Sequence, residues 1–463
     1  MELINYKNFK YDLNYKNEML YSYMQQSKKA NKKTLQYLDI GKQNIEVFGR
    51  QALSPIVFKG GRGVFLYDID DNIYIDFASG VYVTNLGHSH PKISYAICEE
   101  TKKLQNVHDY MTDIKISYLN QLSKRFQNFD YFQLYDNGSI AVEFAVRVAR
   151  EITGKYEILS FYSDFHGKSK GTSSLGRINH THDIAREKGY YLLPRPNMYR
   201  PLWIKDNGEI DTDKYIEFYE LAIKEETTGN IAAIIAEPIQ GWAGTVVPPD
   251  DFFPKLRKLC DKYNILLIAD EILTGFGRTG KFMCMEHWDV EPDIYIIGKG
   301  MSNGFPMSGI VLKKEHSYVL SRIVASNTFG GNPMSCAAGL ATLEIIEDEF
   351  IIENSQKMGS FILERLKQIK EKSSFIGDVR GKGCMLGIEF VKNKTTKEPF
   401  AKFVDELYKI CIDKFLIPGV PGYNVLRLAP PLIIDKEIAN IALNILEEAI
   451  VELENKFLKG GFE

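Results

Sequence analysis

Between about residues 130 and 312, short apolar runs alternate with segments of helical periodicity. Such alternation is typical of βαβ units, which build a mainly parallel sheet flanked by helices. Three of the runs are apolar enough for strands buried on both faces, and they span residues 231–236, 265–269 and 294–297. The chain is therefore expected to have an α/β fold with a large, mainly parallel sheet.

The segments on either side of this region predict a smaller α+β domain that combines both chain ends. Residues 64–68 and 73–76 are alternating runs around an Asp-Asp-Asn turn, which indicates a hairpin. Long helical segments and a glycine-rich stretch follow Pro333. Because 463 residues exceed what one core usually holds, two lobes are expected. The expected division is an N-terminal extension with short helices at 1–45, the first part of the small domain at 46–80, the large domain at 81–333 and the rest of the small domain at 334–463.

Composition excludes several classes of function. The formal net charge of −3 offers no basic footprint for nucleic acid and no polybasic membrane patch. No apolar run approaches the ~20 residues of a membrane helix, and the polar start of the chain lacks a signal-peptide pattern. The six cysteines are scattered without a C-x-x-C pair, as is usual for reduced thiols. We therefore expect a cytoplasmic enzyme that binds neither nucleic acid nor a membrane.

Ionisable side chains follow the three apolar runs. Glu237 comes directly after the first run, Asp270-Glu271 after the second, and Gly298-Lys299-Gly300 after the third. Ligands of open parallel sheets bind beyond the carboxyl ends of the strands, so these groups should converge on one crevice. A single acid after a strand is an ordinary turn residue, but two acids and a lysine are costly to bury unless they pair with each other or with a ligand.

Pyridoxal phosphate is a ligand that would satisfy these groups. It needs an amine to hold its aldehyde, which Lys299 can supply, and a carboxylate to keep its pyridine nitrogen protonated, which Asp270 can supply. The freed amine of Lys299 can then move a proton. The alternative, a solvated turn lysine, suits a Gly-Lys-Gly segment after a buried strand poorly.

A phosphate-binding turn is predicted upstream. Gly138-Ser139 follows a strand-like run and precedes a segment of helical periodicity. Free N–H groups and the dipole at a helix N-terminus favour a phosphate. The alternative is an ordinary Asn-Gly turn with Ser139 as the helix N-cap.

Two other motifs are less specific. Residues 275–280 match G-x-G-x-x-G, but Asp270-Glu271 stand between strand and glycines and no clean apolar helix follows, which disfavours a dinucleotide site. His88-Ser89-His90 has no further ligand set around it, so we expect a structural turn and no metal.

Several blocks, taken together and in this order, resemble one family. They are the hairpin VFLYDIDDNIYIDFASG, LGHSHP, the NGS turn, FHG at 165–167, EPIQG at 237–241, DEILTGFGRTG at 270–280, GKG at 298–300 and NTFGGNP at 327–333. From about Pro55 to the last helix, the chain resembles the class III (ω-amino acid) aminotransferases, which are fold type I pyridoxal-phosphate enzymes.

The resemblance implies a role for each matching residue. By analogy with the family, Lys299 forms the Schiff base, Asp270 pairs with the pyridine nitrogen, Gly138 and Ser139 contact the phosphate, Phe165 and Ile272 cover the two ring faces, and Glu237 supports the cofactor and substrate environment. Thr328 resembles the threonine that reaches the phosphate of the neighbouring subunit, which implies a homodimer with shared active sites. Arg427 resembles the arginine that grips a substrate carboxylate, a task suited to a bidentate guanidinium.

The chain also departs from the family pattern. Members that act on 4-aminobutyrate or ornithine commonly carry Glu after Q-G, where this chain has Trp242. Without that Glu, Arg427 would lack its partner for the amine end of such substrates, which disfavours both. Trp242 and Tyr82 are instead expected to wall an aromatic or apolar pocket, unless Trp242 merely packs under a loop. The remaining departures are Leu273 for a Gln that bonds the ring hydroxyl, Ile140 for Glu, and Asp136 for Asn.

The expected activity is amino-group transfer from an amine or amino acid to a 2-keto acid. Aminomutases, racemases and lyases share the scaffold and the first chemical step, and the departures at Trp242 and Leu273 leave them open. A non-enzymatic binding module gives no reason to keep Lys299 and Asp270 together. The identity of donor and acceptor does not follow from the sequence.

Overall fold

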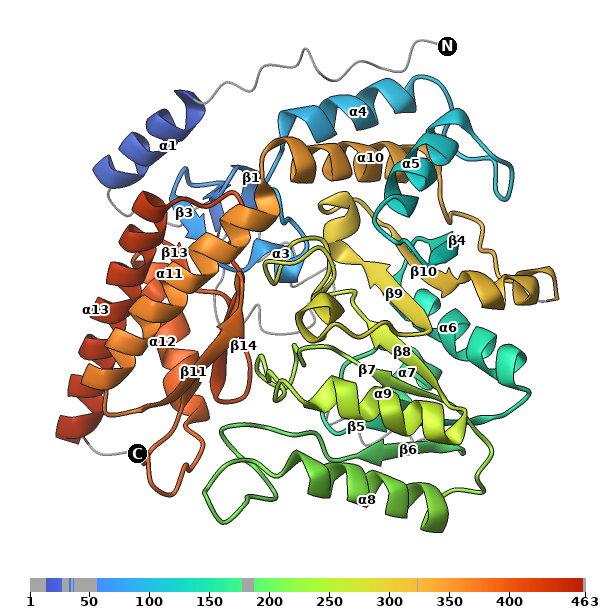
Figure 1. Cartoon of the computed structure of the whole chain (residues 1–463). Helices are drawn as coiled ribbons and strands as arrows, with labels where there is room; N and C mark the ends of the chain where they lie inside the picture. The colour runs from blue at the N-terminus through green and yellow to red at the C-terminus, as the bar shows by residue number, and fades with distance from the viewer. Residues whose placement is uncertain are drawn as a thin grey trace. The chain divides into compact units, whose positions relative to one another are not determined.

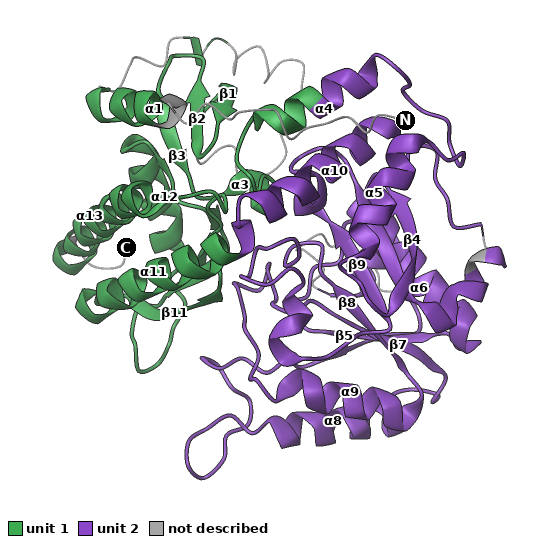
Figure 2. Cartoon of the chain, turned by 45° about the horizontal axis from the view of Figure 1, so that its top comes forward, with its two compact units in different colours: residues 1–95, 353–463 green, residues 96–352 purple. Residues whose placement is uncertain are grey.

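The computed structural model of the chain describes residues 14–26, 33, 34, 36, 56–176, 187–322 and 324–460. The chain divides into two compact units (Figure 2). Unit 1 combines both chain ends, up to Tyr95 and from Glu353, whereas unit 2 is the continuous segment Ala96–Ile352.

A seven-stranded mixed sheet forms the centre of unit 2 (Figure 1). In spatial order its strands are β4 (Phe129–Tyr135), β10 (Ser308–Lys313), β9 (Ile294–Gly298), β8 (Leu266–Asp270), β7 (Ile231–Ala236), β5 (Glu157–Phe161) and β6 (Tyr190–Leu193). Only β10 among these strands is reversed, because it pairs antiparallel with β4 and β9 while the other pairs are parallel. The expected α/β fold with a mainly parallel sheet is thus confirmed.

The middle strands form because their side chains are apolar on both faces. Every residue of β7 and of β9 is buried. Helix α6 (Gly138–Thr153) packs across one face of this sheet, and its alanines and valines join the isoleucines of β7 to β10 in one core. The remaining helices of unit 2 are α4 (Pro91–Thr101, shared with unit 1), α5 (Asp113–Ser123), α7 (Lys170–Ser174), α8 (Thr212–Glu225), α9 (Phe252–Tyr263), α10 (Pro333–Asp348), and the 3₁₀ helices η3 (Cys284–Trp288), η4 (Lys299–Ser302) and η5 (Lys314–Ser321).

The unit boundaries differ from those that the sequence suggests, which fall after residues 80 and 333. Helix α10 lies in unit 2 because it packs against α5 and η4. Its apolar residues are buried all round, so their pattern alone does not tell which unit they join.

Unit 1 contains two four-stranded sheets and three long helices from the C-terminal part of the chain. One sheet has the order β1 (Phe58–Arg62), β2 (Phe65–Asp68), β3 (Ile73–Asp76) and β13 (Leu416–Ile417), and the other has β11 (Ile376–Lys382), β12 (Met385–Phe390), β15 (Val425–Leu428) and β14 (Val420–Pro421). The helices are α11 (Ile351–Lys372), α12 (Ala401–Asp413) and α13 (Lys436–Gly460). The predicted hairpin is the antiparallel pair β2–β3.

Part of the N-terminal extension packs on this hairpin. Helix α1 (Asn14–Gln25) is followed by Gln26, whose side-chain amide bonds both backbone groups of Ile73. Thr34 donates its hydroxyl to Asp70 at 2.6 Å. Residues 1–13, 27–32, 35 and 37–45 of the expected extension lie outside the described part of the chain.

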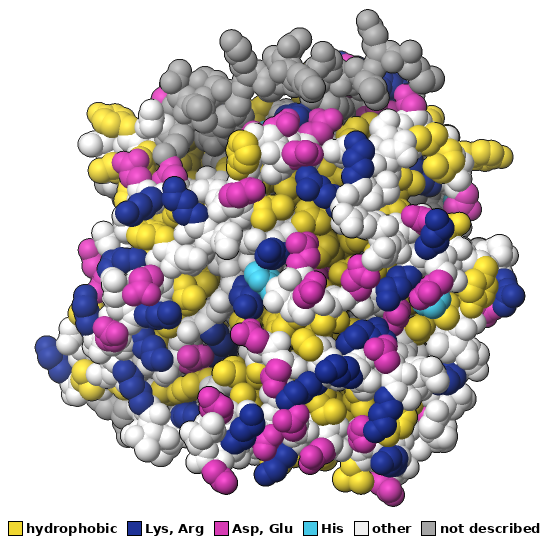
Figure 3. Space-filling view, viewed as in Figure 1, with side chains coloured by type: hydrophobic (Ala, Val, Ile, Leu, Met, Phe, Trp, Pro, Cys, Tyr) yellow, Lys and Arg dark blue, Asp and Glu magenta, His cyan; other side chains and the backbone are white. Residues whose placement is uncertain are grey.

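The described surface carries mixed charge. On the face drawn in Figure 3, basic and acidic side chains are interspersed, and no band of one sign crosses it. None of the helices in the described ranges has both the length and the apolar character needed to cross a membrane.

Candidate active site

Three neighbouring strands deliver the three predicted ionisable residues to one edge of the sheet. Glu237 follows β7, Asp270 ends β8, and Lys299 follows β9. The three strands lie side by side in Figure 1. Adjacent parallel strands lie about 4.8 Å apart, so the backbone sites of these residues form a short row. Lys299 has a φ of 46°, a left-handed conformation that costs a residue with a Cβ about 1–2 kcal/mol. Strain of this kind persists where the surrounding structure holds it in place, and it gathers at functional sites.

Asp270 is buried and accepts two hydrogen bonds. Its Oδ2 lies 2.7 Å from Nδ1 of His166, and its Oδ1 accepts the N–H of Ile272 at 3.2 Å. A carboxylate oxygen has two acceptor positions, so both atoms can still receive a donor from a ligand. His166 in turn lies between Asp270 and Asp164.

Sequence reasoning missed His166, Asp164 and Arg195. Asp164 follows the buried strand β5, and Arg195 follows β6. The rule that singled out Glu237, a charged side chain just beyond a parallel strand, applies to both positions and would have found them. His166 carries no comparable signal, because its partner Asp270 is 104 positions away in the sequence.

Glu237 connects two loops that carry aromatic side chains. Its Oε1 accepts the N–H of Phe165 at 2.7 Å, and its Oε2 accepts the N–H of Gly241 at 2.9 Å. Burial raises the pKa of Glu237 to about 7, and the nearby charge of Asp164 adds to this effect. The ring of Phe165 lies 5.6 Å from that of Trp242, with 30° between the ring planes. Phe165 and Trp242 therefore lie against each other, and the expected pocket wall of Trp242 and Tyr82 stays a prediction.

Gly138 and Ser139 lie at the N-terminus of α6, as the sequence predicts, whereas their role in phosphate binding stays a prediction. Gly138 is the first residue of α6, and Asn137, not Ser139, is the N-cap, because its side chain accepts the N–H of Ser139. The hydroxyl of Ser139 accepts the N–H of Lys168 at 3.2 Å. A Cβ on Gly167, whose φ is 138°, would stand 2.4 Å from that hydroxyl, so only glycine fits beside Ser139 here.

Ile272 connects the phosphate turn with the lysine turn. A Cβ built on Gly138 would lie 3.1 Å from Cδ1 of Ile272, and one on Gly298 would lie 3.4 Å from its Cγ1. Leu273 packs on the next turn, since a Cβ on Gly241 would lie 2.5 Å from its Cδ1. Ile272 therefore borders both glycine turns, and Leu273 supports the turn that precedes Trp242.

The loop with Thr328 is tied to the phosphate turn through its neighbour. Asn327 donates its amide to Asp136, the residue just before the N-cap of α6. Thr328 itself is exposed, and its carbonyl accepts the amide of Asn106 at 2.9 Å. Asp136, one of the departures from the family pattern, thus serves to hold this loop.

Tyr82 and Arg427 belong to unit 1. Tyr82 is 1 % exposed and lies in a left-handed turn, with positive φ at each residue of 79–82. The hydroxyl of Ser79 donates to the carbonyl of Ala429 at 2.5 Å, which fixes this turn to the segment after β15. Arg427, in β15, is 1 % exposed and donates Nε to the carbonyl of Val420 at 3.3 Å. The substrate-binding roles of both residues stay predictions.

The two less specific motifs, residues 275–280 and 88–90, lie in turns or bond to neighbouring residues. Residues 275–280 lie in a run of turns that leads into η3. His88 bonds Oδ2 of Asp76 through Nε2 at 2.7 Å.

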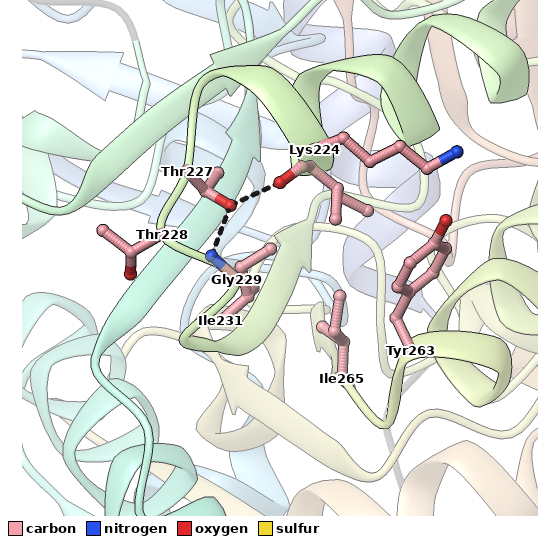
Figure 4. Close-up of a pocket in the computed structure, with 8 residues that line it drawn as sticks. Lys224, Thr227, Thr228, Gly229, Ile231, Tyr263 and Ile265 are labelled. Carbon is pink, nitrogen blue, oxygen red and sulfur yellow. Dashed lines mark hydrogen bonds between the residues drawn. The ribbon is translucent and has the colours of Figure 1, made fainter.

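A cavity of about 270 Å³ opens elsewhere, at the amino ends of β7 and β8 (Figure 4). Its wall includes Lys224, Tyr263, Ile265 and Thr227, whose hydroxyl donates to the carbonyl of Ile223 at 2.7 Å. This cavity lies at the opposite end of these strands from Glu237 and Asp270, so it is not part of the candidate active site.

The unit 2 groups fit the demands of pyridoxal phosphate. Lys299 offers an amine, and Asp270 offers a carboxylate that is already held by a second donor. The helix N-terminus at Gly138 suits a phosphate, and it is a cradle without side-chain bulk. Phe165 and Ile272 offer an aromatic and an aliphatic surface. The residues present therefore match the cofactor that the sequence suggests.

Comparisons with known proteins agree with this fit. The family described as "Aminotransferase class-III" matches residues 48–450. The alanine/serine racemase of Pyrococcus horikoshii is 37% identical over 422 residues, covering 86% of each chain. The acetylornithine aminotransferase of Methanocaldococcus jannaschii is 34% identical over 430 residues, which is 90% of this chain and 98% of that protein. An amine transaminase from an uncultivated Pseudomonas species, solved in its PLP-bound form, superposes with a TM-score of 0.82 at 29% identity, covering 89% of this chain and 98% of that one.

Proposed function

The chain belongs to the class III aminotransferases, a family that uses pyridoxal phosphate, and from this we propose that it transfers an amino group from an amine or amino acid to a 2-keto acid. When bound, the cofactor supplies an aldehyde that condenses with amines and a ring that withdraws electrons. The observation that carries the proposal is the row of Glu237, Asp270 and Lys299 at the ends of three adjacent strands.

The side chains of unit 2 divide the work. Lys299 Nζ would bind the cofactor aldehyde in the absence of substrate. When a substrate amine takes its place, the free Lys299 amine would accept the proton from the substrate Cα and return it two atoms away, beyond the substrate nitrogen. Asp270 keeps a negative charge against the ring nitrogen, and the imidazole of His166 orients its Oδ2. The N–H groups at the start of α6, with the Ser139 hydroxyl, bind the phosphate. Phe165 and Ile272 cover the two ring faces and exclude water from them.

Trp242 favours transfer over a two-base racemisation. Two-base racemisation needs a second proton carrier on the face of the substrate away from Lys299. Beside Phe165 stands the indole of Trp242, which has no proton to exchange with carbon near neutral pH. Transfer needs only Lys299 for its proton shift.

Racemisation is the second candidate, because the alanine/serine racemase of Pyrococcus horikoshii is 37% identical to this chain. The two activities differ in what a single substrate does. One amino acid, added without any keto acid, should convert the bound cofactor to its amine form with one equivalent of keto acid released. An unchanged cofactor spectrum together with loss of optical rotation would instead support racemisation. A panel of amines against pyruvate and 2-oxoglutarate then identifies the donor.

Trp242 is proposed to select donors with apolar side chains. The Trp242→Ala variant should lose about 10- to 100-fold in kcat/KM for its best apolar donor, since a few missing methylene-sized contacts are worth about 1–3 kcal/mol. Small donors such as alanine should lose little. Trp203→Ala is a matched control, because Trp203 packs on Tyr215 and Phe218 instead. Equal losses for large and small donors would contradict the selecting role.

A second copy of the chain is proposed to complete the site at Thr328. Asn106 and Ser326 hold the segments 105–111 and 324–329 together. Around these bonds the chain exposes a group of apolar side chains: Tyr110 (80%), Val324 (76%), Met111 (56%) and Phe329 (56%). Exposed apolar patches commonly mark interfaces.

Phe329→Glu should convert the dimer to monomers in sedimentation velocity and weaken cofactor retention at the same time. Leu221→Glu, at an exposed leucine of α8, should change neither property. A wild-type chain that sediments as a monomer while fully active would contradict the shared site.

A further inference from the structure

A chain of four buried ionisable side chains runs away from the candidate active site. It starts at Asp270 and continues through His166 and Asp164 to Arg195, and these side chains come from β8, from the loop after β5 and from the segment after β6. Each of the four residues is no more than 6 % exposed. Buried charges are costly unless they pair with an opposite charge, so the partner of each of these four side chains matters.

The contacts of His166 determine its protons. Nδ1 lies 2.7 Å from Oδ2 of Asp270, and Nε2 lies 3.3 Å from both Oδ2 of Asp164 and the hydroxyl of Ser160. Ser160 donates its only proton to the carbonyl of Leu175, so its oxygen can only accept from His166. Both ring nitrogens of His166 therefore face acceptor oxygens. Only the doubly protonated imidazolium can donate a hydrogen bond from each nitrogen.

The charges around His166 favour this cation. Burial lowers the pKa of His166, but its hydrogen bond to Asp270 and the charges of Asp164 and Asp270 outweigh burial and raise the pKa to about 10. Two further ionisable groups lie near these residues. The charge of His166 lowers the pKa of Glu237, and Arg195 lies beyond Asp164.

Polar side chains also contact Asp164 from its other side. Its Oδ1 accepts the amide of Gln240 at 2.6 Å and lies 3.5 Å from NH1 of Arg195. Arg195 also donates NH2 to the carbonyl of Pro238 at 2.7 Å. Negative and positive side chains alternate along this row of four residues, so their formal charges sum to zero.

Aromatic rings close the far end of the chain. The guanidinium of Arg195 lies 5.5–5.6 Å from the ring centroids of Phe161, Phe252 and Phe253. Cations gain from such ring faces, and the rings exclude water that would screen the charges. A charge change at Asp164 is consequently felt at His166 with little screening.

We propose that Asp164 and Arg195 are positioning residues for the cofactor-binding acid: Asp164 keeps His166 doubly protonated and aimed at Asp270, and Arg195 holds Asp164 in place and balances its charge. The relation to the cofactor rests on the proposed function, whereas the link between Asp164 and His166 does not. His166 then donates to Asp270 throughout the neutral pH range, which keeps that carboxylate correctly turned for a ring nitrogen.

The test measures the proton state of His166 in the full chain. With ¹⁵N-labelled histidine, the His166 ring signals are identified by their loss in His166→Gln and followed from pH 5.5 to 9.5, with and without pyridoxal phosphate. The wild type should stay doubly protonated until above pH 9. In Asp164→Asn the pKa of His166 should fall by about 2, since an opposite charge at this range shifts a pKa by about 1–3. Asp293→Asn is the matched control, because it removes another buried ion-paired carboxylate, held by Arg257 and Lys313 at the opposite end of the sheet.

A double variant guards against misfolding. Asp164→Asn leaves Arg195 without its counter-ion, whereas Asp164→Asn with Arg195→Met removes both charges and is expected to fold more readily. Both variants should lower the pKa of His166 alike. With pyridoxal phosphate bound, the absorption band of the cofactor should change between pH 6 and 9 in both variants, whereas it is constant over this range in the wild type. A His166 that stays doubly protonated to above pH 9 in both would overturn the proposal. A wild-type protein that binds no pyridoxal phosphate would overturn the proposed function but leave the histidine titration to decide the link to Asp164.

Discussion

Lys299→Ala is expected to abolish amino transfer and to leave the fold intact. The variant has no amine to hold the cofactor aldehyde or to move the Cα proton, and loss of the acid–base role alone costs about 10²- to 10⁴-fold in rate. Alanine and lysine both carry a Cβ, so the strain at φ 46° is unchanged, and thermal unfolding should stay near that of the wild type freed of cofactor. The measurement is kcat for the best donor pair, with far-ultraviolet circular dichroism as the folding check.

The covalent attachment of the cofactor to Lys299 can be tested directly. Borohydride reduction of the coloured wild-type protein, followed by peptide mass mapping, should find the cofactor on Lys299 and nowhere else. The variant should retain cofactor only by non-covalent contacts and lose it on gel filtration. Lys224→Ala, in α8 beside the separate cavity, should behave as the wild type. A Lys299→Ala protein with unaltered colour and turnover would refute the proposed function.

Asp270→Asn is expected to reduce kcat/KM by about 10³-fold, the scale of losing one preorganised electrostatic contact in an active site. An amide has no charge to keep the ring nitrogen protonated, so the electron sink weakens. It also offers one acceptor oxygen where the carboxylate offers two, so either His166 or the N–H of Ile272 loses its acceptor. An unsatisfied buried donor costs about 1–3 kcal/mol, and a lower melting temperature should accompany the lost activity.

The adjacent acid provides the control. The carboxylate of Glu271 accepts hydrogen bonds from the Thr274 hydroxyl and from the N–H groups of Cys284 and Met285. Because successive side chains of an extended segment point to opposite sides, Asp270 and Glu271 face different surroundings. Glu271→Gln should lower stability while leaving the absorption spectrum of the bound cofactor unaltered. If Asp270→Asn and Glu271→Gln change the cofactor spectrum alike, Asp270 is not the partner of the ring nitrogen.

The features that sequence alone predicts here are those with a local cause. β7 and β9 are apolar at each position and need no distant partner to be identified as buried strands. Their order in the sheet then follows from βαβ geometry, which brings Asp270 and Lys299 to one edge. The helix N-terminus at Gly138 is local in the same way.

Features that depend on distant partners are not predictable from local pattern. The bond between His166 and Asp270 joins residues 104 positions apart, and nothing near either residue encodes it. Strand β13 has only two residues, too few to show an alternation, and it is a strand because β3 offers it a hydrogen-bonding edge. The unit to which α10 belongs was likewise decided by packing against α5 and η4.

The pairing of β3 with β13 also has a consequence for how the protein is made. Ile75 leaves the ribosome early, but its neighbour Leu416 is translated only after the whole of unit 2. At about 5–20 residues per second, the hairpin β2–β3 waits tens of seconds with one edge open. Unit 2, continuous in sequence, can meanwhile complete its own sheet. Nascent chains of this protein therefore pass through a stage at which the half with Lys299 is folded while an unpaired strand remains available for wrong partners, and this stage is where chaperones would be of most use.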